Sequence, residues 1–217
     1  GDICAGPAAR ALDAKCKVPC QVVNLPIGLH DTDIFVDTLR RMAGINVSEE
    51  IDLERGQLVD AISDWHQYLY GKSVALVGDP DQLLSLTRFL VALDMKPVYI
   101  VTGSPAGKKY AAALKEAVAE VDGDIKIKVP GDMFLLHQWI KQEPVDLIMG
   151  NTYCKYIARD DDIPYVRFGF PILDRMGHSY FSFMGYRGGL RLVEKILDAL
   201  LDRKDRDSSD IEFELVL

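Results

Sequence analysis

Apolar residues from position 72 onward alternate between short uninterrupted runs and longer segments with helical spacing. The short runs are typical of strands buried on both faces of a parallel sheet. They predict five strands, at residues 74–77, 97–101, 125–129, 145–149 and 165–168. The segments between them predict helices at 79–93, 106–121 and 133–141, a short helix before the last strand, and a final helix at 187–202. Because helices alternate with buried strands, we expect an α/β fold with a doubly wound parallel sheet and right-handed crossovers.

The first 71 residues follow a different, mostly helical pattern. Residues 5–16 are rich in alanine and compatible with a helix, and the apolar run at 18–23 predicts a short strand. Asp31 or Thr32 is a suitable N-cap for a helix that ends at Gly44. The apolar face of that helix consists of Ile34, Phe35, Thr38, Leu39 and Met42. A longer helix is predicted at about 48–70, with an apolar stripe of Ile51, Leu58, Ile62, Trp65 and Leu69.

This change of pattern divides the chain into two regions. We interpret residues 1–71 as the end of a preceding α/β domain plus linking helices, and residues 72–217 as a Rossmann-like C-terminal domain. The chain starts with Gly1-Asp2, without a methionine or a signal-peptide pattern, so we expect a cut inside a longer polypeptide. Residues 203–210 form a charged tail, and the alternating apolar residues at 211–217 suggest an added strand or a partner contact.

Composition argues against several classes of partner. A formal charge of −8 over 217 residues argues against binding to nucleic acid or to an anionic membrane surface. No apolar run approaches the roughly 20 residues of a membrane span. The four cysteines occur in no secretory context, so we expect reduced thiols in a cytoplasmic protein.

Asp60 and Asp64 are the sharpest candidates for a metal site. On the predicted helix they lie only about 40° apart and nearly opposite the apolar stripe. Like charges at this spacing repel each other by a few tenths of a kcal/mol unless a cation bridges them. A hard cation with oxygen ligands would do so. From the residues alone, a solvated acidic face is the simpler interpretation.

Three other motifs favour structural roles. Gly78–Asp81 follows the first predicted strand, but two acids at a helix N-terminus would repel a phosphate, so we expect Asp79 to act as a cap. Residues 102–109 lack the spacing of a phosphate loop and the hydroxyl residue after the lysine, which favours a surface turn. Cys16 and Cys20 lack the two further ligands of a zinc or iron–sulfur site, which favours free thiols.

The remaining polar candidates are scattered. None of the four histidines has a carboxylate or cysteine at a spacing that specifies a metal or catalytic pair: His30, His66, His137 and His178. We expect His137 to pack beside Trp139, and for His178 both a partner contact and simple burial remain open. The acidic run 160–162 predicts a solvated loop, and Asp174-Arg175 predicts a local ion pair or a tie between loops.

Four blocks of sequence, in this order, resemble the second half of a nitrogenase component-one β subunit. They are Leu25–Gly44, Glu54–Lys72, Leu76–Leu90 and Pro144–Arg175, the last reading PVDLIMGNTYCKYIARDDDIPYVRFGFPILDR. The phrases HQWIK, NTYCKYIARDDDIPYVRFGFPILDR and FELVL are most similar to the vanadium-iron branch, with the iron-only branch close behind. Cys154 departs from the family pattern, since relatives usually carry glycine there.

The resemblance implies an oxidoreductase subunit of a complex that reduces dinitrogen to ammonia. Electrons would come from an ATP-driven iron protein, pass through a P-cluster and reach an iron-vanadium or iron-only cofactor in the α subunit. The implied partners are the α subunit, a second β subunit, a small accessory subunit and the iron protein. The P-cluster ligands belong to the N-terminal half, so the resemblance assigns this chain no catalytic and no cluster-binding residue.

The same resemblance gives Asp60 and Asp64 a role. They fall in the string Arg55-Gly56-Gln57-Leu58-Val59-Asp60-Ala61-Ile62-Ser63-Asp64. In β subunits of this family two aspartates of that string help to hold a cation, Ca²⁺ or Mg²⁺, between two β subunits. The resemblance therefore implies a structural role for this chain, in subunit contacts and in cation binding.

Two alternatives remain from the sequence. One keeps the fold but makes the chain part of a cofactor-assembly scaffold or a nitrogenase-like reductase. The other is a free-standing α/β binding module without a redox role. A reading frame with cluster-binding cysteines upstream of Gly1 would eliminate the second alternative.

Overall fold

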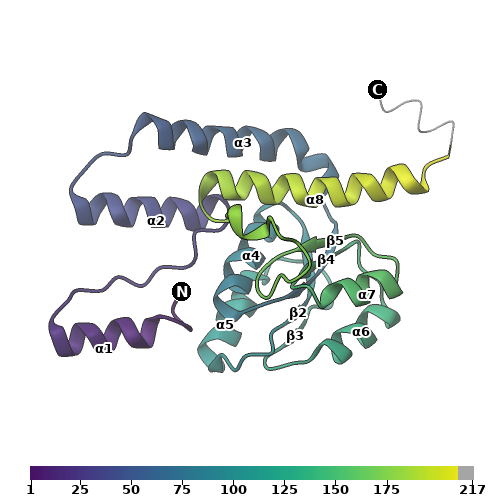
Figure 1. Cartoon of the computed structure of the whole chain (residues 1–217), viewed down its shortest axis with the longest axis horizontal. Helices are drawn as coiled ribbons and strands as arrows, with labels where there is room; N and C mark the ends of the chain where they lie inside the picture. The colour runs from purple at the N-terminus through teal and green to yellow at the C-terminus, as the bar shows by residue number, and fades with distance from the viewer. Residues whose placement is uncertain (210–217) are drawn as a thin grey trace.

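A computed structural model describes residues 1–209 and centres on a five-stranded parallel sheet (Figure 1). The strands are β1 (Ser73–Val77), β2 (Lys96–Val101), β3 (Lys126–Lys128), β4 (Leu147–Gly150) and β5 (Tyr165–Arg167). Their order across the sheet is β3-β2-β1-β4-β5, with every neighbouring pair parallel. The chain therefore reverses its direction of winding between β1 and β4, which confirms the doubly wound fold.

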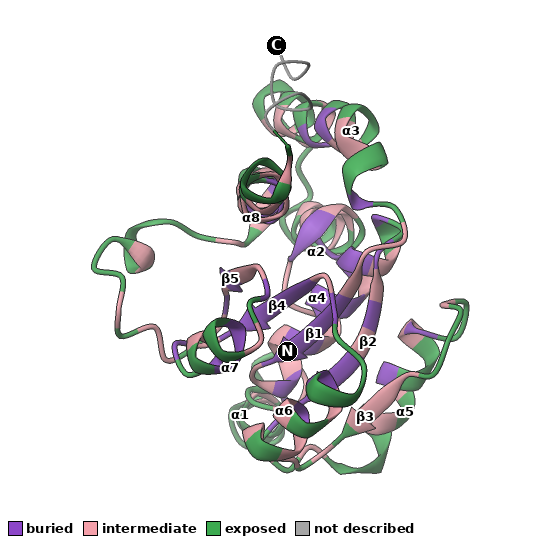
Figure 2. Cartoon of the chain, turned by 90° about the vertical axis from the view of Figure 1, so that its right-hand side faces the viewer, coloured by how far each residue is buried: buried purple, intermediate pink, exposed green. Residues whose placement is uncertain are grey.

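Helices cover both faces of this sheet (Figures 1 and 2). The helices after the first three strands are α4 (Pro80–Ala92), α5 (Gly107–Ala117) and α6 (Met133–Gln142). The short α7 (Cys154–Asp160) joins β4 to β5, and the long α8 (Gly185–Asp207) closes the described chain. A single 3₁₀ turn, His178–Tyr180, interrupts the loop before α8.

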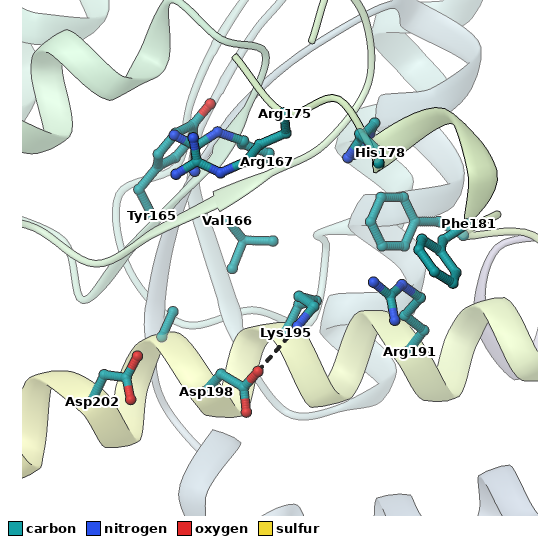
Figure 3. A pocket seen from close by; sticks show the side chains of 13 residues that line it. Tyr165, Val166, Arg167, Arg175, His178, Phe181, Arg191, Lys195, Asp198 and Asp202 are labelled. Carbon is teal, nitrogen blue, oxygen red and sulfur yellow. Dashed lines mark hydrogen bonds and ion pairs between the residues drawn. The ribbon is translucent and has the colours of Figure 1, made fainter. Parts of the chain in front are cut away.

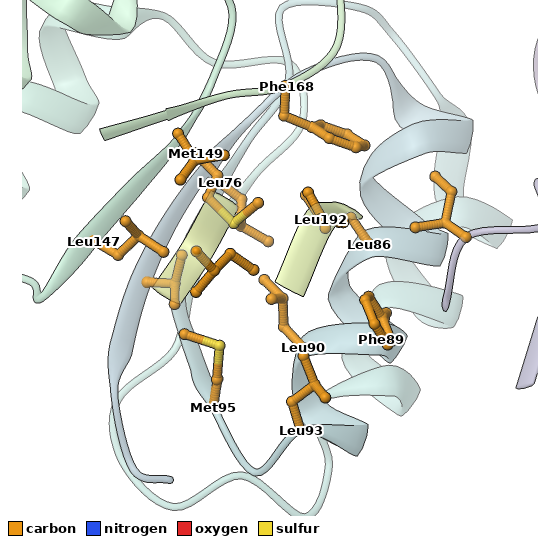
Figure 4. Packing of buried hydrophobic residues seen from close by; sticks show 14 of the residues in the cluster. Leu76, Leu86, Phe89, Leu90, Leu93, Met95, Leu147, Met149, Phe168 and Leu192 are labelled. Carbon is orange, nitrogen blue, oxygen red and sulfur yellow. The ribbon is translucent and has the colours of Figure 1, made fainter. Parts of the chain in front are cut away.

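The alternation of strand side chains divides the core into two layers. Val74 and Leu76 of β1 join a cluster with α4, α5 and α8, in which Leu86, Leu90 and Leu192 are fully buried (Figure 4). Ala75 and Val77 face the opposite way, into a second cluster with Leu136, Ile140 and Ile157 of α6 and α7. Period-two alternation in a sheet buried on both faces explains why the strands are apolar throughout.

The residues before the sheet form three helices, of which two pack on α8. They are α1 (Gly6–Cys16), α2 (Gly28–Ala43) and α3 (Glu49–Leu69). Helix α3 lies against α8 on the side away from the sheet, whereas α2 contacts the N-terminal part of α8 and also α4 (Figure 1). Gly189 makes this approach possible, because a Cβ there would lie 3.0 Å from Leu58 and 3.4 Å from the Cα of Gly28.

Asp33 of α2 connects this helix to α3 and to α8 through hydrogen bonds. Its carboxylate accepts hydrogen bonds from the Arg55 guanidinium on α3, at 3.0 and 2.9 Å, and from the Tyr186 hydroxyl on α8, at 2.7 Å. Burial alone would raise the pKa of Asp33, but the bonds from Arg55 and Tyr186 outweigh that effect and lower it. The charged form of Asp33 is therefore part of the folded structure.

The helical region differs from its sequence-based prediction in two places. Residues 17–27 contain no strand, so the strand expected at 18–23 is wrong, since no described strand lies beside it to form a ladder. Helix α2 begins at Gly28, so Asp31 and Thr32 do not cap it but lie buried in its first turn. There the Thr32 hydroxyl donates to the Gly28 carbonyl, and Asp31 lies 3.7 Å from Arg88.

The apolar face predicted for α2 is only partly covered, with Phe35 and Thr38 half-buried. Ile34, Leu39 and Met42 are 41%, 50% and 61% exposed. The helix contacts its neighbours through its first turn, where Gly28, Asp31 and Thr32 are buried. Beyond that turn, the described residues leave Ile34, Leu39 and Met42 exposed.

Two further expectations concern the end of the chain. Helix α8 continues to Asp207, so most of the charged tail predicted at 203–210 is helical. Arg206 of this segment pairs with Asp162 at 2.8 Å, and Arg203 lies 3.2 Å from the same carboxylate. The strand or partner contact suggested for 211–217 lies outside the described residues. No described helix is both long and apolar enough to cross a bilayer.

Substitution of Gly28 tests the contact between α2 and α4. A methyl group at Gly28 would lie 2.1 Å from the Phe89 ring, and the backbone φ of +75° is left-handed. We expect Gly28→Ala to lower the free energy of unfolding by about 1–2 kcal/mol from backbone strain and by about 1–3 kcal/mol more from overpacking. Gly44→Ala is the control, because its φ is +65° but no atom lies within 4 Å. If urea denaturation showed that both variants lose the same free energy of unfolding, overpacking against Phe89 would be contradicted.

Candidate functional site

The loops at the carboxyl ends of β4 and β5 are joined by one carboxylate. Asp174 accepts two hydrogen bonds from the Arg167 guanidinium, Nε at 3.0 Å and Nη2 at 2.7 Å, and one from the Thr152 hydroxyl at 3.1 Å. Thr152 Oγ1 in turn accepts from the Leu173 amide at 2.7 Å. The bonds from Arg167, with a smaller contribution from Thr152, hold the pKa of Asp174 well below its usual range. The tie between loops expected from Asp174-Arg175 is confirmed, with Arg167 as the main partner.

A groove of about 700 Å³ lies between β5, the loop that follows it and α8 (Figure 3). Arg167 and Arg175 lie on the strand side and Arg191 on α8, with His178 and Phe181 between them. Asp198 and Asp202 line the groove farther along α8, where Asp198 pairs with Lys195 at 3.2 Å. The groove is therefore basic at one end and acidic at the other.

The chemistry of this groove favours binding over catalysis. Burial lowers the pKa of His178, and the charges of Arg167 and Arg191 lower it further. Arg167 is already paired with Asp174, and the Arg191 guanidinium lies 4.1 Å from the centre of the Phe181 ring. Among the residues that line the groove, none is a serine, threonine or cysteine that could act as a nucleophile beside His178.

The acidic loop that follows β1, near the place where doubly wound folds bind ligands, contacts the N-terminal segment of the chain. Asp81 at the start of α4 accepts hydrogen bonds from the amides of Ile3 at 3.0 Å and Cys4 at 2.8 Å. Asp79 is the N-cap residue of α4, as expected, but its side chain makes no cap hydrogen bond. A carboxylate of the loop Gly78–Asp81 therefore binds backbone amides of the N-terminal segment.

Asp60 and Asp64 both lie on the exposed side of α3. The buried residues of this helix are Leu58, Ala61 and Leu69, which confirms that the two acids are on the opposite face. No third histidine, cysteine or acid among residues 1–209 joins them in a group with metal-binding spacing. Their role in cation binding stays a prediction that requires ligands from outside the described chain.

The structure corrects the interpretation of two histidines. His66 of α3 lies 2.7 Å from Asp94, and His137 of α6 lies 2.7 Å from Asp161 and 3.2 Å from Asp160. The sequence showed no partner for either, because 28 residues separate His66 from Asp94 and the acids near His137 belong to another helix. The acidic run 160–162 is solvated as expected, with the side chains of Asp160 and Asp162 56% and 64% exposed, and each of its residues also forms an ion pair.

The cysteines and the glycine-rich turn agree with their structural interpretations. Cys4, Cys16, Cys20 and Cys154 are free thiols. Cys154 is fully buried at the start of α7, and burial raises the pKa of its thiol to about 12. Residues 102–106 form a bend before α5, and Lys109, the second lysine of the turn, pairs with Asp2 at 3.0 Å.

Comparison with known proteins gives one consistent family. The family described as "Nitrogenase component 1 type Oxidoreductase" matches residues 2–201. The nitrogenase molybdenum-iron protein beta chain of Clostridium pasteurianum is 48% identical over 210 residues, which are 96% of this chain and 45% of that protein. The corresponding beta chain of Frankia alni is 37% identical over 209 residues, 95% of this chain and 39% of that protein.

A solved structure described as "Nitrogenase Cp1 at pH 6.5" has the same fold throughout. It superposes on the chain with a TM-score of 0.96 and 46% identity, covering all of this chain and 47% of the other. The chain therefore spans less than half the length of these relatives. The similarity extends over both the helical region and the sheet.

The hydrogen bonds that Asp174 accepts from Arg167 and Thr152 predict that the stability of the fold depends on pH. A carboxylate whose pKa is lowered by folding stabilises the protein fully above the ordinary aspartate pKa of about 3.9 and loses that effect as the pH falls toward the folded-state value. We expect Asp174→Asn to lower the free energy of unfolding at pH 7, with the difference from the wild type shrinking below about pH 4. Urea denaturation over a pH series measures this. Asp122→Asn, at an exposed position, is the control. If the loss of unfolding free energy in Asp174→Asn stayed constant down to pH 2, a lowered pKa of Asp174 would be contradicted.

Proposed function

The chain belongs to the nitrogenase component 1 type oxidoreductase family, and from this premise we propose that it is the C-terminal portion of a dinitrogenase β subunit. The observation that carries the proposal is the 48% identity to a molybdenum-iron protein beta chain across 96% of this chain. The superposition over the whole chain, at a TM-score of 0.96, supports it. In the complete complex, dinitrogen would be reduced to ammonia with electrons from an ATP-driven iron protein.

In this proposal the chain has a structural role. Residues 1–71 complete a preceding domain and link it to the Rossmann-like domain at 72–217. The P-cluster and the active-site cofactor would be bound by other parts of the complex, in the cytoplasm. The partners would be the α subunit, a second β subunit, the iron protein and, for an alternative nitrogenase, a small accessory subunit.

Two exposed apolar surfaces support this role. The first lies on α2, α3 and their connection, where five large apolar side chains are 41–63% exposed: Ile34, Leu39, Met42, Ile45 and Leu53. The second lies on the loop before α8, where five are 53–98% exposed: Phe170, Leu173, Met176, Tyr180 and Phe181. Exposed large apolar side chains that cluster in this way along one segment favour protein contacts. We propose that the rest of the β subunit and neighbouring subunits cover both surfaces.

The metal of the active-site cofactor is a separate question. The phrases HQWIK and FELVL resemble the vanadium-iron branch, whereas the curated relatives described above are molybdenum-iron beta chains. Identity over most of the chain carries more weight than short phrases, so we favour molybdenum-iron and keep vanadium-iron and iron-only as the alternatives. A cofactor-assembly scaffold with the same fold would contain no P-cluster when isolated.

Metal analysis of the purified full-length complex tests both the assignment to a dinitrogenase and the molybdenum-iron type. We expect iron in large excess over one heterometal, which is molybdenum in the favoured case and vanadium in the alternative. Iron without any heterometal would indicate the iron-only type. A full-length protein that purifies alone, without iron and without an α subunit, would overturn the proposal in favour of a free-standing binding module.

The exposed acids of α3 give a second test. We propose that Asp60 and Asp64 contribute to a Ca²⁺ or Mg²⁺ site completed by another β subunit. Asp64→Ala should weaken binding of that cation to the assembled complex at least about tenfold, because a charged oxygen ligand is lost. Asp52→Ala, an exposed acid in the first turn of the same helix, should leave it unchanged. Equal affinity of wild type and Asp64→Ala in a calcium titration would remove the site without affecting the family assignment.

A further inference from the structure

Three metal-ligating side chains converge between the middle of α6 and the end of α7, far along the chain from Asp60 and Asp64. His137 lies in the middle of α6, Asp160 is the last residue of α7, and Asp161 follows it. One ligand atom from each lies within 4.8 Å of the other two. Among residues 1–209 this is the only group of three or more histidines, cysteines or acids with such spacing.

The fold brings these residues together and keeps them in place. Helices α6 and α7 cover the same face of the sheet (Figure 1). Leu136 and Ile140, on either side of His137, are fully buried in the second core cluster, as are Ile157 and Ala158 of α7. The three polar side chains therefore stand at the rim of a packed layer, where their backbones cannot move apart freely.

Two of the ligand atoms lack hydrogen bonds. His137 Nε2 and Asp161 Oδ2 are both shielded from solvent, and neither forms a hydrogen bond although they lie only 2.7 Å apart. Buried polar atoms without partners are uncommon in folded proteins, and a bound water or ion is one arrangement that satisfies them. Asp160 is more open, with a side chain 56% exposed, so a third ligand stands where an ion could enter from solvent.

The spacing suits a small transition-metal ion. Ligand atoms about 2.0–2.1 Å from a tetrahedral zinc ion lie about 3.3 Å from each other. The distance from His137 Nε2 to Asp160 Oδ2 is 3.2 Å, and the 2.7 Å distance to Asp161 Oδ2 would open slightly. Imidazole with carboxylates favours zinc and its neighbours over Ca²⁺ and Mg²⁺, which prefer oxygen alone.

We propose that His137, Asp160 and Asp161 form a site for a divalent transition-metal ion of the zinc type, with water in the fourth position. The ion links α6 to α7 and supplies the missing partner of the two buried ligand atoms. The site is independent of the proposed inter-subunit cation, because it lies on other helices and its ligand set includes a nitrogen.

Lys141 makes the proposal sharply testable. Its ammonium group lies 2.9 Å from Asp160 Oδ2 and competes with any cation for that oxygen. Its side chain is 55% exposed, so it can turn into solvent when a metal binds. Removal of this charge should therefore strengthen metal binding, whereas an ordinary ion-pair cluster would merely lose a partner.

The experiment is equilibrium dialysis of the purified protein against micromolar Zn²⁺, with accessible thiols alkylated and with excess Mg²⁺ to fill oxygen-only sites. We expect His137→Ala to bind one Zn²⁺ fewer per chain than the wild type. Asp160→Asn, at an exposed position, should weaken the same site about tenfold or more without unfolding the protein. Lys141→Gln should strengthen it several-fold.

His66→Ala is the matched control, because His66 faces only one carboxylate, Asp94, at the same 2.7 Å. It should retain the full zinc stoichiometry. The proposal is overturned if His137→Ala and the wild type bind equal amounts of zinc, or if Lys141→Gln binds zinc no more tightly than the wild type. Circular dichroism of each variant separates loss of the site from loss of the fold.

Discussion

The close approach of α8 to α2 and α3 is the constraint on which the rest of the structure depends. One side of α8 is apolar and completes the core above the sheet, with Leu192, Val193 and Ile196 fully buried. In its first turns Gly189 lets α8 approach Leu58 of α3 and Gly28 of α2, and Arg187 pairs with Glu54 of α3 at 2.8 Å. The helix thus joins two layers at once, and the helical region shares its core with the sheet: Ile27 and Leu69 belong to the same cluster as Val74 and Leu192.

Aspartates hold together segments that are far apart in the sequence. Asp33 joins three helices, Asp81 holds the N-terminal segment, and Asp174 joins the loops after β4 and β5. A short carboxylate with several acceptor positions can accept two or three donors at once from different elements. The net charge of −8 therefore does not describe an evenly solvated acidic surface, because many of the acids are used within the fold.

These internal ties leave the outer surfaces free for assembly. The groove lies between β5, the loop that follows it and α8, and α2 extends from the N-terminal end of α8 (Figure 1). Neither surface contains a catalytic pair among the described residues. A rigid layer with exposed contact surfaces agrees with the proposed structural role in a larger oxidoreductase, whose redox centres would be bound elsewhere.

The sequence alone determined the class of fold, the order of the elements and the family. Strand and helix periodicity located all five strands and placed Leu58 and Leu69 on the buried side of α3, because the type of an element depends on neighbouring residues. The four ordered blocks identified a component-one β subunit, and the family comparison confirms that much.

Only the tertiary structure determines which helix faces are buried and which charged side chains pair with each other. The apolar face of α2 is regular in sequence yet partly exposed, because no local signal states whether a partner helix is present in the same chain. His137 gave no motif, since its carboxylates come from the end of another helix and meet it only after α6 and α7 pack on the same face of the sheet. The same holds for Asp33 with Tyr186, which are 153 residues apart. Local periodicity fixes the element, whereas contacts between distant elements require the whole fold.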